Sequence, residues 1–284
     1  MVATKPTRND KVKQAIERID QHLQELAEEM AQGKSERLVQ YLNFCAQFHR
    51  YSFGNLMLAF SQFPTLTRIA GVKQWNKLGR HVKAGEKGIM ILAPMPVKRR
   101  RGREESESPE EEAEEESTIL LFKPVYVFDE SQTEGSELPE LISASGDVVA
   151  CYPALKEAVE AAGIVVEYVE VIAELPGAEG LSLGGCIKVA YQEAPAEEFR
   201  VLVHEFAHEL LNKTAEREAH TVRETEADAV AYVVCRHFGV TCDTADYLLL
   251  HDSNPKLLLE RLERVRQTAN HIITTIADSD ISED

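Results

Sequence analysis

The sequence predicts an α+β fold, in which helices and a small β-sheet come first and a second small sheet with long helices follows. Apolar residues recur at helical spacing over 11–31, 35–48 and 52–60, and again over long segments after Pro195. Segments 89–92 and 118–128 are short and β-rich, and they are bounded by turn residues. The 284 residues suffice for about two domains.

We expect a first domain over 8–130, a polar linker with Gly and Pro over 131–146, and a second domain over 147–278. In the first domain, the strand around Ile91 should pair with 118–128. About 98–117, between them, a basic run is followed by a Glu-rich run. Such blocks of like charge repel themselves and bury little apolar surface, which predicts a disordered insertion.

The second domain should contain one helix, two strands and three further helices. In chain order these elements are expected at 152–162, 164–171, 185–190, 195–212, 216–238 and 255–276. Pro195 suits a first helical turn, and Gly239 suits the position after a helix.

The net charge of −17 hides a strong asymmetry along the chain. Residues 34–103 hold 14 Lys/Arg and 2 Asp/Glu, whereas residues 104–116 hold 9 acidic and no basic residues. A basic segment in an acidic chain indicates an anionic partner. The five cysteines show no CxxC spacing, which argues against a disulfide framework or a cysteine zinc site. With no long apolar stretch and no apolar leader, we expect a cytoplasmic protein without membrane contact.

One short motif carries chemistry. His204-Glu205-Phe206-Ala207-His208 is an HExxH sequence within a predicted helix. Residues four apart lie on one helix face, so the two imidazoles can share a metal ion. Glu205 is the expected general base for a water molecule activated by that ion. The alternative is a solvated helical histidine pair without a metal.

A catalytic zinc ion needs a third protein ligand. On the next predicted helix, Glu224 and Asp228 share one face. Glu224 is the candidate third ligand, and Asp228 would support a ligand imidazole by a hydrogen bond. Glu226 points elsewhere on that helix and is the weaker choice, while His220 is a rival ligand just upstream.

The segment from Phe199 to Leu211, followed by Glu224-Thr225-Glu226-Ala227-Asp228, resembles the gluzincin pattern of HExxH and then ExxAD. It is most similar to the ImmA/IrrE-type metallopeptidases. The resemblance implies a small α+β metallopeptidase domain with Zn²⁺ on His204, His208 and Glu224, and with Glu205 as base. Another divalent ion such as Mn²⁺ would suit the same site. Spacing identifies no oxyanion-stabilising residue, for which Tyr232 and His220 are the candidates.

Residues 41–92 combine positive charge with aromatic side chains, as single-stranded nucleic acid requires for phosphates and bases. Within this segment, residues 79–88 form a turn-rich basic loop whose backbone can approach phosphates. The alternative is that the aromatic residues belong to the core. The candidate DNA-contacting residues are Arg50, Tyr51, Asn55, Lys73, Trp75, Arg80, Lys83 and Lys87.

The segments 51–56, 71–75 and 79–89 resemble the N-terminal domain of ArdC-type antirestriction proteins. The resemblance implies a domain that binds single-stranded DNA, followed by a metallopeptidase-like domain of the ImmA/IrrE kind. The implied role is protection of incoming mobile DNA from host restriction, or a related regulatory task. A protein substrate or a component of a restriction system is a further candidate partner.

Two other functions remain open from the sequence. The first alternative is a non-catalytic DNA-binding protein whose metal site is structural. The second is a regulatory peptidase that cleaves one specific protein and uses DNA only for recruitment. Loss of function on substitution of Glu205 would argue against the first, and a cleaved partner would favour the second.

Overall fold

The computed structural model describes residues 6–33, 36–99, 117–138, 148–211, 219–240 and 254–279. The chain forms two compact units. The first comprises residues 1–18 and 61–136, and the second comprises residues 19–60 and 137–284. Within the described ranges, no helix is long and apolar enough to span a bilayer.

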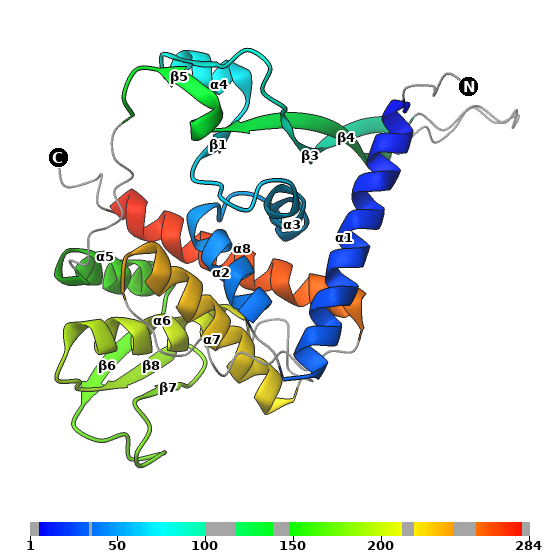
Figure 1. The fold of residues 1–284 in the computed structure, drawn as a ribbon. Helices are drawn as coiled ribbons and strands as arrows, with labels where there is room; N and C mark the ends of the chain where they lie inside the picture. The colour runs from blue at the N-terminus through cyan, green and yellow to red at the C-terminus, as the bar shows by residue number, and fades with distance from the viewer. Residues whose placement is uncertain are drawn as a thin grey trace, which may run out of the picture. The chain divides into compact units, whose positions relative to one another are not determined.

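The first unit is built on the antiparallel pair of β3 (Ile89–Arg99) and β4 (Ser117–Asp129), drawn as the long ribbon in Figure 1. Ile91 lies opposite Val125, so the predicted pairing is present. The short strand β1 (Ile69–Ala70) pairs with the other edge of β4, which gives the order β1-β4-β3. Most of the predicted insertion, residues 100–116, lies outside the described residues.

A second part of this unit holds α4 (Val72–Lys77) and the antiparallel pair of β2 (Arg80–Val82) with β5 (Thr133–Gly135). The 3-10 helix η1 (Glu130–Gln132) begins after Asp129, whose carboxylate caps it. Residues 131–135 of the predicted linker therefore form ordered structure, and 139–146 lie outside the described residues.

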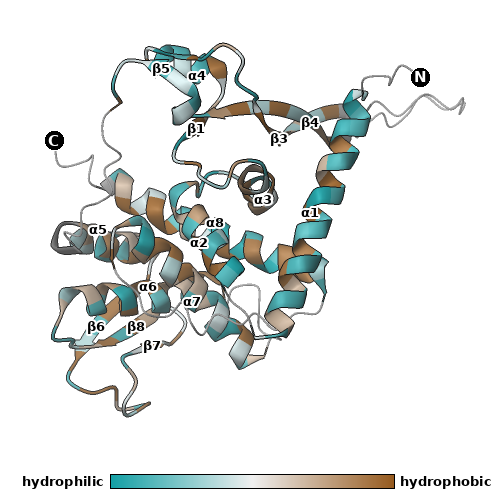
Figure 2. Cartoon of the chain, viewed as in Figure 1, coloured by the Kyte–Doolittle hydropathy of each residue, from teal (hydrophilic) through white to brown (hydrophobic). Residues whose placement is uncertain are grey.

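Helices dominate the second unit. It contains the later part of α1 (Arg8–Ala31), together with α2 (Glu36–Gln47) and most of α3 (Phe53–Gln62). After the linker come α5 (Val148–Ala161), α6 (Pro195–Leu211), α7 (His220–His237) and α8 (Pro255–Ser279). In Figure 2, α1 and α8 carry teal and brown residues along their length, as amphipathic helices do.

The compact units do not coincide with the predicted domains, because residues 19–60 pack with the C-terminal segment, and the domain boundary at residue 130 stays a prediction. Helix α2 contacts α7 through its buried face. Tyr232 on α7 donates a hydrogen bond to Asn43 on α2 over 2.8 Å. Glu263 on α8 accepts one from the Phe53 amide over 2.7 Å. Apolar spacing in a single helix does not specify its partner, so this assignment could not be made from the sequence.

A small three-stranded sheet completes the second unit. Strands β6 (Val165–Val169) and β8 (Cys186–Ala190) are parallel, and β7 (Gly180–Ser182) is antiparallel to β8 at the edge. Helix α6 contacts β7 and β8, and α5 contacts β6 (Figure 1). The predicted elements of this half are present with small shifts of their ends, except that β7 was missed because three residues show no periodicity.

Candidate metal centre

Helix α6 positions both histidines and Glu205. It begins at Pro195 and carries Glu197 and Glu198 in its first turn, where the helix dipole favours negative charge. Its apolar residues are buried and fix its rotation about its own axis. These residues include Phe199, Leu202, Val203, Phe206, Ala207 and Leu211. His204 and His208 therefore lie one turn apart on the face turned toward α7.

Helix α7 brings the third candidate ligand. The Nε2 atoms of His204 and His208 are 3.0 Å apart. The two carboxylate oxygens of Glu224 lie 3.5 Å from His204 Nε2 and 3.4 Å from His208 Nε2. Two atoms bound at about 2.1 Å to a tetrahedral ion lie about 3.4 Å apart. The three side chains therefore fit a divalent metal ion without large rearrangement.

Asp228 lies beside the other ring nitrogen of His204. Its Oδ1 is 3.0 Å from His204 Nδ1, which is an ion-pair distance. Such a carboxylate fixes which imidazole nitrogen faces the ion.

Contacts between carboxylates and imidazole nitrogens shift the pKa values of the residues in this centre. Burial lowers the pKa of His204, but the carboxylates of Asp228 and Glu224 outweigh burial and raise that pKa to about 9. The same contacts, first with His204 and then with His208, hold the pKa of Glu224 well below its usual range. Burial raises the pKa of Glu205. Two imidazole nitrogens and a carboxylate are a donor set that zinc accepts.

Glu205 is covered by the edge strand β7. Gly180 packs so closely that a Cβ atom there would lie 2.6 Å from both Cγ and Oε1 of Glu205. A side chain at this point of the strand would force either β7 or the Glu205 side chain to move. A cavity of about 340 Å³ opens beside Glu205, His208 and Glu224.

Glu209 was not among the residues predicted from the sequence. It is 7% exposed, and its carboxylate accepts hydrogen bonds from Ser182 Oγ and from the backbone N–H groups of Gly184 and Gly185. These contacts fasten the turn between β7 and β8 to the motif helix. A glutamate after HExxH was visible in the sequence, but its partners depend on the folded turn.

The other residues considered for the metal centre lie away from the three candidate ligands or at the edge of the centre. Glu226 is 1% exposed, and both its oxygens accept from Arg264 Nη2, at 2.5 and 2.6 Å. Tyr232 bonds to Asn43 and is also buried. The His220 side chain is 77% exposed, with Nε2 3.5 Å from Glu224 Oε1. His220 thus lies near the centre and Tyr232 has a structural partner.

The predicted DNA-contacting residues are divided between the units. Arg50, Tyr51 and Asn55 belong to the second unit, whereas Lys73, Trp75, Arg80, Lys83 and Lys87 belong to the first. Arg50, Lys73, Lys83 and Lys87 are exposed. Lys83 donates to the Ser131 carbonyl, and Arg80 donates to Thr133 and to the Ser136 carbonyl. Arg80 therefore also fastens β2 to β5.

Trp75 differs from its predicted role as a stacking platform. It is 2% exposed, and its indole N–H donates to the Phe128 carbonyl over 2.9 Å. The ring thus anchors α4 to the end of β4 as a core residue. Stacking needs an open ring face, and sequence composition alone does not separate these two roles.

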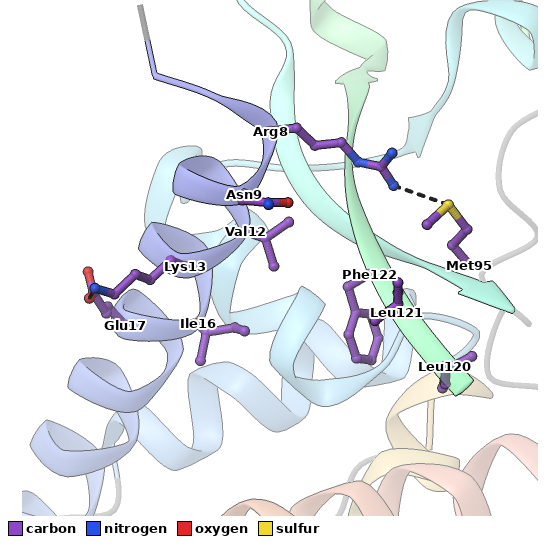
Figure 3. A pocket seen from close by; sticks show the side chains of 10 residues that line it. All are labelled: Arg8, Asn9, Val12, Lys13, Ile16, Glu17, Met95, Leu120, Leu121 and Phe122. Atoms are coloured by element: carbon purple, nitrogen blue, oxygen red, sulfur yellow. Dashed lines mark hydrogen bonds and ion pairs between the residues drawn. The ribbon is translucent and has the colours of Figure 1, made fainter. Parts of the chain in front are cut away.

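Exposed aromatic rings of the first unit occur on β4 instead. Phe122 is 44% and Tyr126 is 45% exposed. Phe122 lines a groove of about 650 Å³ between β3, β4 and the start of α1 (Figure 3). Arg8 reaches across this groove to Met95 Sδ, and Lys11 donates to the Tyr126 hydroxyl. These residues could not be singled out from the sequence, because β-rich alternation also fits a buried strand.

Fold and site together define an α+β protein with an HExxH helix and a candidate metal centre of two histidines and one glutamate. Residues 9–128 match the family model described as the N-terminal domain of anti-restriction factor ArdC, so this segment is an ArdC-type N-terminal domain. That match confirms the predicted family for the N-terminal part. Membership of the C-terminal part in the ImmA/IrrE-type metallopeptidases stays a prediction.

A protein from Bacillus anthracis described as uncharacterized is 26% identical over 294 residues, which cover 87% of this chain and 49% of the relative. The chain thus spans about half the length of that relative. The Mn(II)-bound crystal structure of the antirestriction ArdC protein from the R388 plasmid matches with a TM-score of 0.51 and 16% identity, over 91% of this chain and 98% of that one. The metal-free structure of the same protein matches with a TM-score of 0.48 and 17% identity, over 80% of this chain and 86% of that one. At such identity the Mn(II)-bound match concerns the fold alone.

Proposed function

We propose that this chain is an antirestriction protein of a mobile element with a metal-dependent, peptidase-like centre. His204, His208 and Glu224 would hold one divalent ion, Zn²⁺ by expectation and Mn²⁺ as the alternative. The observation that carries the proposal is the convergence of these three side chains from two helices at 3.0–3.5 Å. The Mn(II)-bound form of the R388 ArdC protein supports the expectation of a divalent ion.

Each residue of the centre has a distinct role in this proposal. A divalent ion would supply an activated water and polarise a carbonyl. Glu205, buried beside the ligands, would accept and deliver the proton. Asp228 would hold the His204 ring with Nε2 toward the ion. Gly180 and the strand β7 would exclude water from one side of Glu205 and leave the cavity as the approach for a peptide.

Substitution of Glu205 by Gln tests catalysis separately from metal binding. The change keeps the ligands and removes the base, so bound metal should be retained. If the centre is catalytic, protection of an incoming unmodified plasmid in a restricting host should fall sharply. Unchanged protection by Glu205→Gln would exclude catalysis and leave the structural-metal alternative. Capture of a cleaved host protein that is absent with Glu205→Gln would favour the regulatory peptidase.

Single-stranded DNA binding by the first unit is the second part of the proposal. It is supported by the ArdC-type N-terminal match and by the exposed cations Lys73, Lys83 and Lys87. Phe122 and Tyr126 are the exposed rings of this unit that suit base stacking. Phosphate contacts make affinity depend steeply on salt.

The DNA proposal is tested with a fluorescent oligothymidine at several salt concentrations. Affinity should fall as salt rises, and Lys83→Ala with Lys87→Ala should reduce both affinity and the salt slope. Phe122→Ala should weaken binding without changing that slope. Lys256→Ala, an exposed position on α8, is the matched control and should behave as wild type. Binding that is insensitive to salt would contradict the proposal.

A further inference from the structure

Among the residues that the structure describes, the cavity beside the candidate metal centre is lined by a cation that the proposed chemistry does not use. Besides Glu205, His208 and Glu224, this cavity of about 340 Å³ is lined by Arg223, the residue just before Glu224 on α7. The guanidinium therefore reaches the same space as the ligands. A substrate held at the centre would extend past it.

Arg223 has no ion pair or hydrogen bond of its side chain among the residues that the structure describes, and its Nε is buried without a partner. Two other arginines of this unit form ion pairs. Arg200 pairs with Glu179 and Glu197, and Arg264 with Glu226. A guanidinium is always charged and presents a planar fork of donors suited to a carboxylate. Its donors are thus available to a ligand in the cavity.

The start of α7 adds to the positive potential near Arg223. Ala219 at the cap position provides no side-chain hydrogen bond, and the first turn of α7 carries no acidic residue. The N-terminal end of a helix favours negative charge. The nearby carboxylates of Glu224 and Glu205 face the metal centre, and Glu224 contacts imidazoles.

We propose that Arg223 binds a carboxylate of the peptide substrate, either an acidic side chain near the reacting bond or a free C-terminus. This inference rests on the proposed function of the centre and names its substrate class. A carboxylate forms two parallel hydrogen bonds with guanidinium, which selects acidic peptides over neutral ones. Arg223 is thus a specificity-determining residue rather than part of the metal site.

The charge of the surrounding chain favours a peptide carboxylate over nucleic-acid phosphate. Residues 137–284 hold 11 Lys/Arg and 28 Asp/Glu, so this segment has a formal charge of 11 − 28 = −17. A polyanion would be repelled over its length. A single carboxylate needs only the short-range contact that Arg223 offers.

Binding of three hydroxamate probes to the zinc-loaded full chain tests the inference by calorimetry. All three begin with a succinyl hydroxamate that chelates zinc, and they continue as Ala-Ala-amide, Asp-Ala-amide or Ala-Ala with a free carboxylate. One of the two acidic probes should bind about tenfold to a hundredfold tighter than the neutral probe, as expected for a charged hydrogen bond. The tighter acidic probe identifies side chain or C-terminus as the source.

The variants separate this inference from the proposed function. Arg223→Gln should abolish the preference and leave the affinity for the neutral probe unchanged, while Arg223→Lys should retain part of it. Arg236→Gln, an exposed position near the other end of α7, is the matched control. Equal binding of all three probes to wild type would overturn the role of Arg223 alone, whereas no probe binding would overturn the metal centre with it. If an oligothymidine displaces the neutral probe from wild type but not from Arg223→Gln, the assignment of Arg223 to a peptide carboxylate would also be overturned.

Discussion

Gly180 covers Glu205 so closely that a single added methyl group would lie 2.6 Å from the Glu205 carboxylate oxygen Oε1. The same Cβ would lie 2.8 Å from Val201 Cγ1. Real Cβ contacts are longer, so either the strand β7 or the Glu205 side chain must move. The edge strand thus packs directly against the general base of the proposed reaction.

Gly180→Ala should therefore impair the proposed reaction and leave metal binding intact. Because a catalytic group displaced by about 1 Å can lower the rate by about a hundredfold, a large loss of plasmid protection is expected. Bound metal and protection are measured on the same preparation. Gly71→Ala is the control, since a Cβ there meets nothing within 4 Å. Loss of metal together with activity would contradict this separation of roles.

Glu224 and Glu226 are two residues apart on α7, yet they should respond oppositely to substitution. Glu224→Gln should lower metal affinity strongly and change the free energy of unfolding of the metal-free protein little. Glu226→Gln should destabilise the fold by about 3–5 kcal/mol, because it removes the buried carboxylate that pairs with Arg264.

Urea unfolding of the metal-free variants and a zinc titration with a competing chelator measure the two effects. Folded Glu226→Gln should still bind zinc as wild type does. If Glu226→Gln lost zinc affinity while Glu224→Gln kept it, the ligand assignment would have to be exchanged.

Asp129 should make the stability of the first unit depend on acid pH. Burial raises the pKa of this carboxyl, but hydrogen bonds from Ser131, Thr67 and Arg68 outweigh burial and lower it below its ordinary value of 3.8. A folded-state pKa below the unfolded one adds stability that is present above about pH 4 and lost as pH falls toward the folded value.

Asp129→Asn should lower the free energy of unfolding at neutral pH by about 1–3 kcal/mol, since an amide cannot accept all these donors. It should also reduce the loss of stability between about pH 5 and pH 3. Urea unfolding at a series of pH values provides the measurement. An acid dependence equal to that of wild type would show that the pKa of Asp129 is the same in the folded and unfolded states, and would contradict this prediction.

The placement of the candidate ligands could be predicted from sequence because their spacing is mostly local. His204 and His208 share a face by helical spacing alone, and Glu224 with Asp228 repeat that spacing on the next long helix. The structure brings the two helices together. The distances among ligand atoms required the folded pair.

Other features depend on tertiary contacts that no spacing encodes. Trp75 is an aromatic residue in a basic segment, as base stacking would require, but it is buried like a core residue. The strand β7 is three residues long, so Gly180 could not be recognised as the cover of Glu205. The contacts of Glu209 arise only when the turn after β7 folds back onto α6.

The most direct test of the central claim is the metal content of the purified chain, measured by inductively coupled plasma mass spectrometry. After incubation with Zn²⁺ or Mn²⁺ and gel filtration, about one divalent ion per chain is expected, as for a single centre of this kind. His204→Ala should retain less than about a tenth of it, while His271→Ala, at an exposed position on α8, should match wild type. Wild-type protein without bound ion, or a His204→Ala variant that keeps the ion, would contradict the proposed metal centre.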